Sequence, residues 1–212
     1  MTDLLAITVS SFFLAFSGAA MPGPLMTATI GESARRGPVA GPALVAGHGI
    51  LELLLVILLM LGLAPFLKQD MVFAVIAMAG ALMLAGMGVS MLLKVPGLTL
   101  SREASGGGMS RLVAAGAVLS LSNPYWTLWW STIGLTYILY SARLGNAGVA
   151  LFFAGHLLGD LAWYSALSFA VGRGRRFMSD RSYRVIVALC SLFLVVLAAV
   201  FAVSGLRTFL SV

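Results

Sequence analysis

Residues 39–67 read VAGPALVAGHGILELLLVILLMLGLAPFL, and this stretch decides the fold class. It contains no Lys or Arg, and its only ionisable side chains are His48 and Glu52. A helix needs roughly 20 apolar residues to cross the hydrocarbon of a bilayer, so this run is typical of a membrane span. Glu52 lies sixteen residues from both Arg36 and Lys68. At about 1.5 Å rise per residue, that spacing places it near the bilayer midplane.

The same composition extends over the whole chain. Of the 212 residues, 60% are hydrophobic and 9% are charged, which is too little polar surface for a water-soluble exterior. Windows of similar length and hydrophobicity predict six membrane-spanning helices, which leave almost no chain for a soluble domain. These predicted spans cover residues 4–30, 39–67, 71–93, 112–140, 147–171 and 185–206.

Neither end of the chain nor its cysteine points to a secreted protein. The first apolar run ends in small residues at 17–20, as a signal peptide does. However, the residues before the run include Asp3 and no Lys or Arg, whereas a signal peptide begins with a positively charged segment. The single cysteine, Cys190, excludes an intramolecular disulfide and is interpreted as a packing residue of the sixth span.

Basic residues predict the orientation of the chain, because loops that stay in the cytoplasm collect Lys and Arg. The first, third and fifth loops share one side of the membrane and hold ten of these residues, whereas the opposite side holds three. Both termini are therefore predicted to be periplasmic. The net charge of +6 is explained by this asymmetry and by anionic lipid head groups, so no nucleic-acid partner is expected. The ten are Arg35, Arg36, Lys94, Arg102, Arg111, Arg173, Arg175, Arg176, Arg181 and Arg184, and the three are Lys68, Arg143 and Arg207.

A polar, glycine-containing stretch divides the chain into two halves of three spans each. It predicts a first repeat over residues 1–94, a flexible cytoplasmic linker over 95–110 and a second repeat over 111–212. The second span of each half carries a related motif, AGHGILE at 46–52 and AGHLLGD at 154–160, and these contain the only two histidines of the protein. An internal repeat is the favoured interpretation. Since each half crosses the membrane an odd number of times, the repeat is inverted, as in many secondary transporters.

Two carboxylates at membrane depth are the strongest functional signal. His48 with Glu52, and His156 with Asp160, are four residues apart and share a helix face. A carboxylate at the bilayer centre costs at least ~2.5 kcal/mol on insertion scales, so both are expected to face the bundle interior. The second and fifth spans are predicted to meet there, with Glu52 and Asp160 on facing surfaces.

Three interpretations of these four side chains stay open. They could be polar links between helices, in which each histidine binds its own carboxylate. They could form a midplane site in which Glu52 and Asp160 exchange protons or bind a cation. His48, Glu52, His156 and Asp160 would also suit a divalent transition metal such as zinc or manganese.

The first span of each half contains a predicted helix break. Pro22, Gly23 and Pro24 interrupt one, and Asn123 and Pro124 interrupt the other. A broken membrane helix is tolerated where protein or a water-filled cavity satisfies the freed backbone groups. A half-helix N-terminus could then hold a substrate carboxylate, while Glu52 or Asp160 holds its ammonium.

Aromatic residues directly follow the second break. Tyr125 and Trp126 are candidates for a cation–π contact with an ammonium group. The other aromatics of this region, Trp129, Trp130, Trp163 and Tyr164, are interpreted as packing residues or interfacial anchors.

These residues resemble the lysine-exporter type (LysE/RhtB) family of amino-acid translocators. The resemblance covers both halves in order. It departs from the family pattern at Glu52, where Asp is more usual, in the aromatic segment after Pro124, and in the doubled histidine. The matching features are the Pro-Gly-Pro at 22–24, Arg35-Arg36-Gly37, the Gly47 to Gly62 stretch with its one acidic residue, Asn123-Pro124, and Gly155 with Asp160.

The resemblance implies an inner-membrane exporter of amino acids or related zwitterions, driven by proton exchange and often dimeric. A divalent metal exporter is the alternative, because the wider superfamily includes metal carriers, and a non-transporting scaffold is the third class. Neither an enzymatic centre nor a cofactor is expected. The sequence has no Gly-Lys-Ser/Thr phosphate loop that would couple the chain to ATP.

Overall fold

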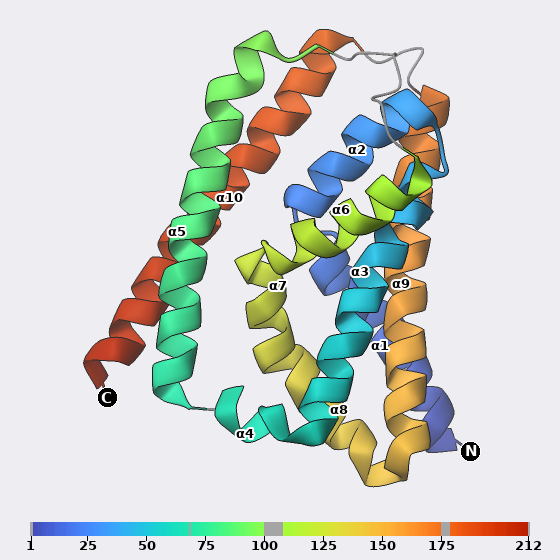
Figure 1. Cartoon of the computed structure of the whole chain (residues 1–212), viewed down its shortest axis with the longest axis vertical. Coiled ribbons are helices and arrows are strands. Elements are labelled where there is room, and N and C mark those ends of the chain that lie inside the picture. The colour runs from blue at the N-terminus through green and yellow to red at the C-terminus, as the bar shows by residue number, and fades with distance from the viewer. Residues whose placement is uncertain (1, 68, 100–107, 175–178, 212) are drawn as a thin grey trace.

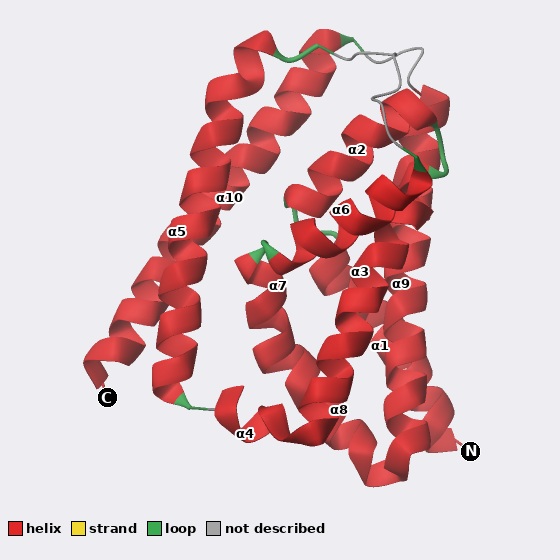
Figure 2. Ribbon diagram, viewed as in Figure 1, coloured by secondary structure: helices red, strands yellow, loops and turns green. Residues whose placement is uncertain are grey.

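The computed structural model describes residues 2–67, 69–99, 108–174 and 179–211, and every regular element within them is a helix (Figure 2). The prediction of an all-helical membrane protein is thereby confirmed in its class. Residues 100–107, half of the predicted linker, lie outside the described residues, as do Lys68, Arg175 and Arg176. The division into repeats and linker stays a prediction.

Five helical segments are long and apolar enough to cross a membrane, one fewer than the six predicted spans. The difference lies in the predicted fourth span. Its first part is a shorter apolar helix, Met109–Leu121, and its second part runs on into the fifth span as one helical segment. The five segments are Thr2–Ala19, Ala40–Leu63, Asp70–Gly97, Tyr125–Gly174 and Asp180–Ser211.

Both predicted helix breaks are present. α1 (Thr2–Ala19) ends before the Pro-Gly-Pro motif, and α2 (Pro24–Arg36) begins at its second proline. α6 (Met109–Leu121) likewise ends just before Asn123, and α7 (Pro124–Trp129) begins at the following proline. Proline suits the first position of a helix, because the N–H that it lacks would have no partner there. A proline therefore begins the second helix at each break.

The long segment after the second break reverses direction within itself. α7 continues through a π-helical turn, η3 (Trp130–Gly134), into α8 (Leu135–Ser141) and the short η4 (Ala142–Leu144). Gly145 then has φ +72, a left-handed conformation that favours glycine. From this turn, α9 (Gly145–Gly174) runs back through the molecule (Figure 1).

The remaining long helices are α3, α5 and α10. α3 (Ala40–Leu58) passes through a π-helical turn, η1 (Leu59–Leu63), and Gly62 with φ +110 redirects the chain into the short α4 (Ala64–Leu67). α5 (Asp70–Lys94) follows and ends in the 3-10 turn η2 (Val95–Gly97). α10 (Asp180–Ser211) is the last helix and packs along α5 (Figure 1).

Glycines join the two halves by letting helices of one half approach helices of the other. α3 packs along α6, where a Cβ on Gly47 would overlap the backbone of Val113. α9 packs along α1 in the same way, where a Cβ on Gly155 would overlap the backbone of Thr8. Gly47 and Gly155 are the central residues of the two Ala-Gly-His motifs. Close approach at small residues is typical of membrane helix packing.

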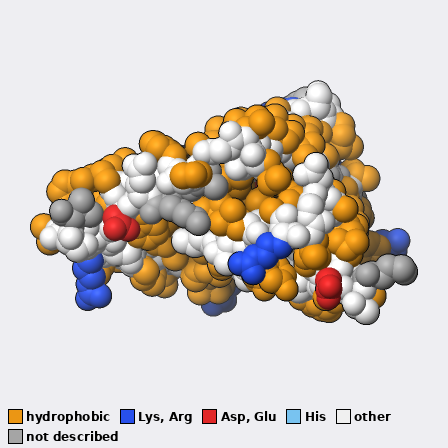
Figure 3. Space-filling model, turned by 90° about the horizontal axis from the view of Figure 1, so that it is seen from below, with side chains coloured by type: hydrophobic (Ala, Val, Ile, Leu, Met, Phe, Trp, Pro, Cys, Tyr) orange, Lys and Arg blue, Asp and Glu red, His pale blue; other side chains and the backbone are white. Residues whose placement is uncertain are grey.

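The outer surface is mainly apolar, as expected where lipid is the solvent. Long side chains such as Leu61, Leu82 and Leu210 are more than 70% exposed, and hydrophobic side chains dominate the space-filling view with few charged groups among them (Figure 3). Both termini lie at one end of the bundle, with α4, and the ends of α2, α5 and α9 lie at the other (Figure 1). Those three helix ends carry basic residues in their last turns.

Candidate functional site

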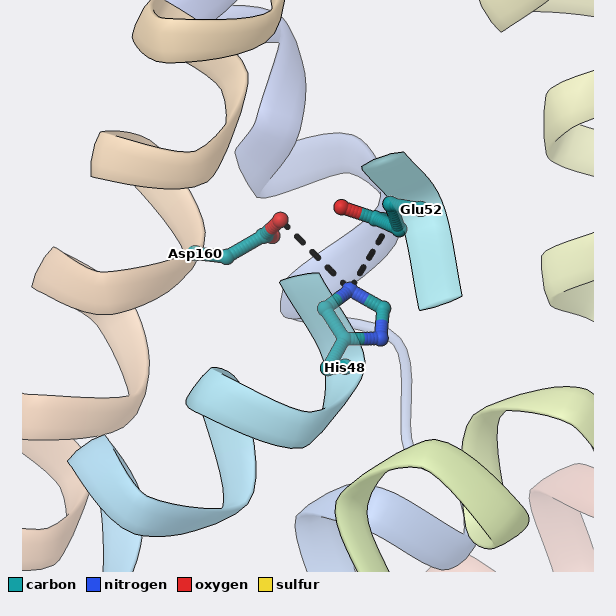
Figure 4. Close-up of side chains that lie close together, drawn as sticks. All are labelled: His48, Glu52 and Asp160. Atoms are coloured by element: carbon teal, nitrogen blue, oxygen red, sulfur yellow. Dashed lines mark ion pairs between the residues drawn. The ribbon is translucent and has the colours of Figure 1, made fainter. Parts of the chain in front are cut away.

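The two histidine–carboxylate pairs meet in the interior of the bundle. His48 and Glu52 come from α3, and His156 and Asp160 from α9. All four side chains are buried, and Glu52 is only 1% exposed. The prediction that the second and fifth spans bring Glu52 and Asp160 together is confirmed, because both carboxylates lie within 3.5 Å of the same imidazole nitrogen of His48 (Figure 4).

Each histidine contacts both carboxylates, so the two pairs form one cluster. His48 Nε2 lies 3.0 Å from Glu52 Oε1 and 3.5 Å from Asp160 Oδ2. His156 Nε2 lies 3.4 Å from Glu52 Oε1 and 3.3 Å from Asp160 Oδ2. Each imidazole thus contacts the carboxylate one turn away in its own helix and also the carboxylate of the other helix, so the four side chains link α3 to α9.

Two tryptophans of α7 and η3 bind the carboxylate of Glu52. Trp130 Nε1–H donates to Glu52 Oε1 at 2.9 Å, and Trp126 Nε1–H donates to the same oxygen at 3.2 Å. The second oxygen, Oε2, is buried and has no hydrogen-bond partner among the described residues. One oxygen of Glu52 is thus anchored by two indole N–H groups, and the other is left for a ligand or a proton.

The two histidines have different surroundings on the other side of their rings. His48 Nδ1 lies 2.7 Å from the hydroxyl of Ser120, near the end of α6. His156 Nδ1 is buried, with no hydrogen-bond partner in the described part of the chain. Its ring lies instead against Trp129, at 4.7 Å between centroids, and against Trp130 and Phe152. The two motifs are related in sequence, but their imidazoles are held differently.

A cavity opens beside the cluster, where the two helix breaks face each other. A Cβ on Gly23 would lie 3.4 Å from Asn123 Nδ2, so the two interrupted backbones are neighbours. The space open to the centres of water molecules in the cavity is ≈ 40 Å³, room for about three waters at roughly 10–15 Å³ each. Its lining includes all four residues of the cluster, together with Gly18, Ala19, Met21, Gly23, Leu25, Met26, Ser120, Asn123, Tyr125, Trp126, Trp129, Trp130 and Tyr164.

Most predicted site residues therefore lie at one cavity, but within the described part of the chain Pro22 and Pro24 do not line it. Gly23, Asn123, Tyr125 and Trp126 do, together with the cluster. Pro22, Pro24 and Pro124 set the ends of the helices around it, and Asn123 caps α7 by accepting the backbone N–H of Tyr125. Tyr125 is turned partly away from the site, because its hydroxyl donates to the carbonyl of Ser17.

Three residues of the site were not predicted from the sequence. Trp130 was interpreted as packing or an anchor, yet it donates the shorter bond to Glu52. Its spacing of four residues from Trp126 places both indoles on one helix face, which is the signal that could have identified it. Ser120 and Trp129 contact the two histidines, and their sequence context gave no comparable indication.

The geometry does not favour the metal alternative. Ligand atoms of His48, Glu52 and Asp160 lie within 4.8 Å of one another, close enough to be considered. However, Glu52 Oε1 already accepts two indole N–H bonds, and both histidine Nε2 atoms approach it as hydrogen-bonding groups. A metal ion bound between Nε2 of His48 and Oε1 of Glu52 would have to displace these hydrogen bonds.

Comparison with known proteins gives two matches. The family model described as LysE type translocator matches residues 16–205. The protein named "Chemotactic transduction protein ChpE" from Pseudomonas aeruginosa is 31% identical over 208 residues, covering 96% of this chain and 100% of the relative. No solved structure matches the chain.

Proposed function

We propose that this chain, which belongs to the LysE type translocator family, exports amino acids or related small zwitterions across the inner membrane in exchange for protons. Membership of the family and several apolar helices make it a multi-pass membrane transporter rather than an enzyme. One observation supports the export of zwitterions in exchange for protons. Two carboxylates and two imidazoles are buried together beside a cavity where two helix breaks meet.

The cavity offers complementary groups for the two ends of a zwitterion. Glu52 Oε2 is a buried acceptor without a partner among the described residues, and it can bind an ammonium group. Asn123 uses its carbonyl oxygen to cap α7 and directs its amide nitrogen toward Gly23 in the other break. That amide can donate to a substrate carboxylate. The broken helices thus provide one pole of the site and the acidic cluster provides the other.

Proton exchange follows from the cost of burial. Removing a bound ammonium takes one positive charge away from two buried carboxylates, and a charge at this depth is expensive. Protons taken up by the cluster offset that charge, so substrate and proton compete for the same groups. Glu52 and Asp160 are therefore the proposed coupling residues, with substrate moving one way and protons the other.

Alternating access is proposed to use the two halves as an inverted repeat. The second helix of each half packs along the first helix of the other, as α3 does with α6 and α9 does with α1. This exchange of partners is expected if the halves are equivalent, and the glycines of the two Ala-Gly-His motifs lie at both contacts. Small shifts at these contacts would open the cavity to one side or the other.

The proposed orientation places both termini in the periplasm. Basic residues gather in the last turns of α2, α5 and α9, at the end of the bundle away from the termini, and such residues mark cytoplasmic loops. A homodimer is proposed only from the family resemblance.

Transport by purified protein in liposomes tests the function. A panel of neutral, basic and acidic amino acids and, in separate samples, zinc or manganese is loaded inside. A proton gradient is applied, and efflux is compared with that from liposomes without the protein. Efflux of at least one amino acid that depends on the gradient is expected, together with no efflux of zinc or manganese. Metal transport without amino-acid transport would replace the proposal, and correctly inserted protein that moves nothing would favour a non-transporting scaffold.

A further inference from the structure

The hydroxyl of Ser120 has two neighbours and a single hydrogen to donate. It lies 2.7 Å from His48 Nδ1 and 2.7 Å from the carbonyl oxygen of Gly116 one turn earlier in α6. If the hydroxyl donates to Gly116, then His48 Nδ1 must carry a hydrogen and donate to the Ser120 oxygen. If the hydroxyl donates to His48, then Nδ1 must be bare. Both arrangements satisfy the serine without moving the imidazole ring.

The other ring nitrogen of His48, Nε2, carries a hydrogen in both arrangements of Ser120. Nε2 lies 3.0 Å from Glu52 Oε1, and two groups that both lack a hydrogen would repel at that distance. The hydrogen between them has to come from the imidazole, because Oε1 already accepts the indole N–H groups of Trp126 and Trp130. An oxygen with two such donors is a poor place for a proton. Nε2 therefore carries the hydrogen in either arrangement of Ser120.

We infer that Ser120 is a positioning residue that lets His48 gain and lose a proton at Nδ1 while its Nε2–H stays bonded to Glu52. A proton arriving through the cavity adds to the lone pair of Nδ1, and the Ser120 hydroxyl turns from His48 to Gly116. Release of the proton reverses both changes. Each cycle therefore changes the charge of the cluster by one unit. The use of this proton exchange in transport rests on the proposed function. The hydrogen-bond pattern itself does not depend on a substrate.

Other titratable groups face His48 and share its environment. From its own helix there is Glu52, and from α9 there are His156 and Asp160, all three in contact within the cluster. The phenol groups of Tyr164 on α9 and Tyr125 on α7 line the same cavity. Ser120 is the group that meets His48 on its Nδ1 side, and it belongs to α6, on the opposite side from the carboxylates.

The arrangement is not repeated at the second histidine. Ser120 stands four residues before Pro124, where α7 begins, and the residue four before Pro24, where α2 begins, is Ala20. The first half thus has no hydroxyl at the corresponding place, and His156 Nδ1 has no hydrogen-bond partner in the described part of the chain. The two histidines are inequivalent, and His48 is the one equipped to exchange a proton.

Nitrogen-15 NMR of the full chain in lipid nanodiscs tests this directly, because the protein has only two histidines. With both labelled, and with His156→Gln used for assignment, a titration reports the protonation of each ring nitrogen. We expect Nε2 of His48 to stay protonated throughout, while Nδ1 changes. In Ser120→Ala, the pH at which Nδ1 loses its proton should fall by about one unit, since the hydroxyl makes two hydrogen bonds beside the charged ring and one beside the neutral ring.

Two further variants control the experiment. Ser120→Thr keeps a hydroxyl and should titrate like the native protein. Ser191→Ala removes another buried serine, one that donates to the carbonyl of Val187 in its own helix, and should leave both histidines unchanged. If Ser120→Ala fails to fold, the protonation of His48 in the native protein and in Ser120→Thr still decides the matter.

Two results would overturn the inference: a neutral His48 whose hydrogen is on Nδ1, or an Ser120→Ala titration that matches the native one. Neither result depends on finding a substrate. If no amino acid of the panel is transported, the inference about Ser120 still stands, and if the inference about Ser120 fails, the transport assay still tests the proposed function. Where an amino acid is transported, its efflux in Ser120→Ala should have a displaced pH dependence that Ser120→Thr restores.

Discussion

Replacing Trp130 with Phe should lower the stability of the folded protein, because it removes a hydrogen bond to the charged carboxylate of Glu52. The Trp130 indole is 1% exposed and donates the shorter of the two bonds to Glu52 Oε1, at 2.9 Å. A hydrogen bond to a charged group contributes about 1.5–3 kcal/mol, and the smaller phenyl ring also leaves a void. We expect Trp130→Phe to lower the free energy of unfolding by about 2–4 kcal/mol.

Trp129 provides a matched control one residue earlier. Its indole N–H donates to the neutral hydroxyl of Ser17 at 3.0 Å, a type of bond that contributes about 0.5–1.5 kcal/mol. Trp129→Phe makes the same change of ring at a similarly buried position. It should therefore cost about 1 kcal/mol less than Trp130→Phe.

A double-mutant cycle assigns the difference to Glu52. Glu52→Gln keeps an acceptor for the indole but removes the charge, so Trp130→Phe should cost about 1 kcal/mol less in that background. Unfolding by SDS in mixed micelles, followed by circular dichroism, gives the four free energies. A coupling of zero, together with equal losses for the Trp129 and Trp130 variants, would show that the indole does not support the carboxylate.

Three other predictions address transport, packing and topology. Glu52→Gln and Asp160→Asn should insert and fold yet lose gradient-driven amino-acid efflux by at least about tenfold, measured in liposomes; full transport in both would defeat the proposed coupling. Gly155→Ala should lower the free energy of unfolding in SDS by about 1–3 kcal/mol, because the added Cβ would overlap α1. Gly86 has open space around it, so Gly86→Ala should change the free energy of unfolding little. A cysteine at Thr2 in a cysteine-free background should react with a membrane-impermeant maleimide from the periplasmic side, and protection there would reverse the proposed orientation.

Much of the fold follows from local sequence, because lipid imposes simple rules on length and polarity. The third and sixth spans, 71–93 and 185–206, were predicted close to α5 and within α10. The breaks were predicted because proline cannot continue a helix hydrogen-bond pattern. The predicted fourth span does not qualify as one continuous crossing, because the break at Asn123 leaves its first helix only thirteen residues long.

The meeting of Glu52 and Asp160 could also be predicted, since neither could face lipid at that depth. The cross-contacts within the cluster could not. Which carboxylate each imidazole reaches depends on how closely α3 and α9 approach, and that distance is set by packing across the whole bundle. The role of Trp130 was missed for a related reason. Its spacing from Trp126 shows that the two indoles share a helix face, but the acceptor of their N–H groups is known only once the facing helix is placed.

The bonds to Glu52 also have a consequence for biosynthesis. The indoles that bind its carboxylate belong to residues 74 and 78 positions later in the chain. When α3 leaves the ribosome and enters the bilayer, α7 has not yet been made, and α9, which brings Asp160 and His156, follows later still. For that interval Glu52 can turn only to His48, its neighbour one turn away. A nascent chain that stalls between its halves therefore presents a poorly paired acidic group to lipid, which is costly at that depth.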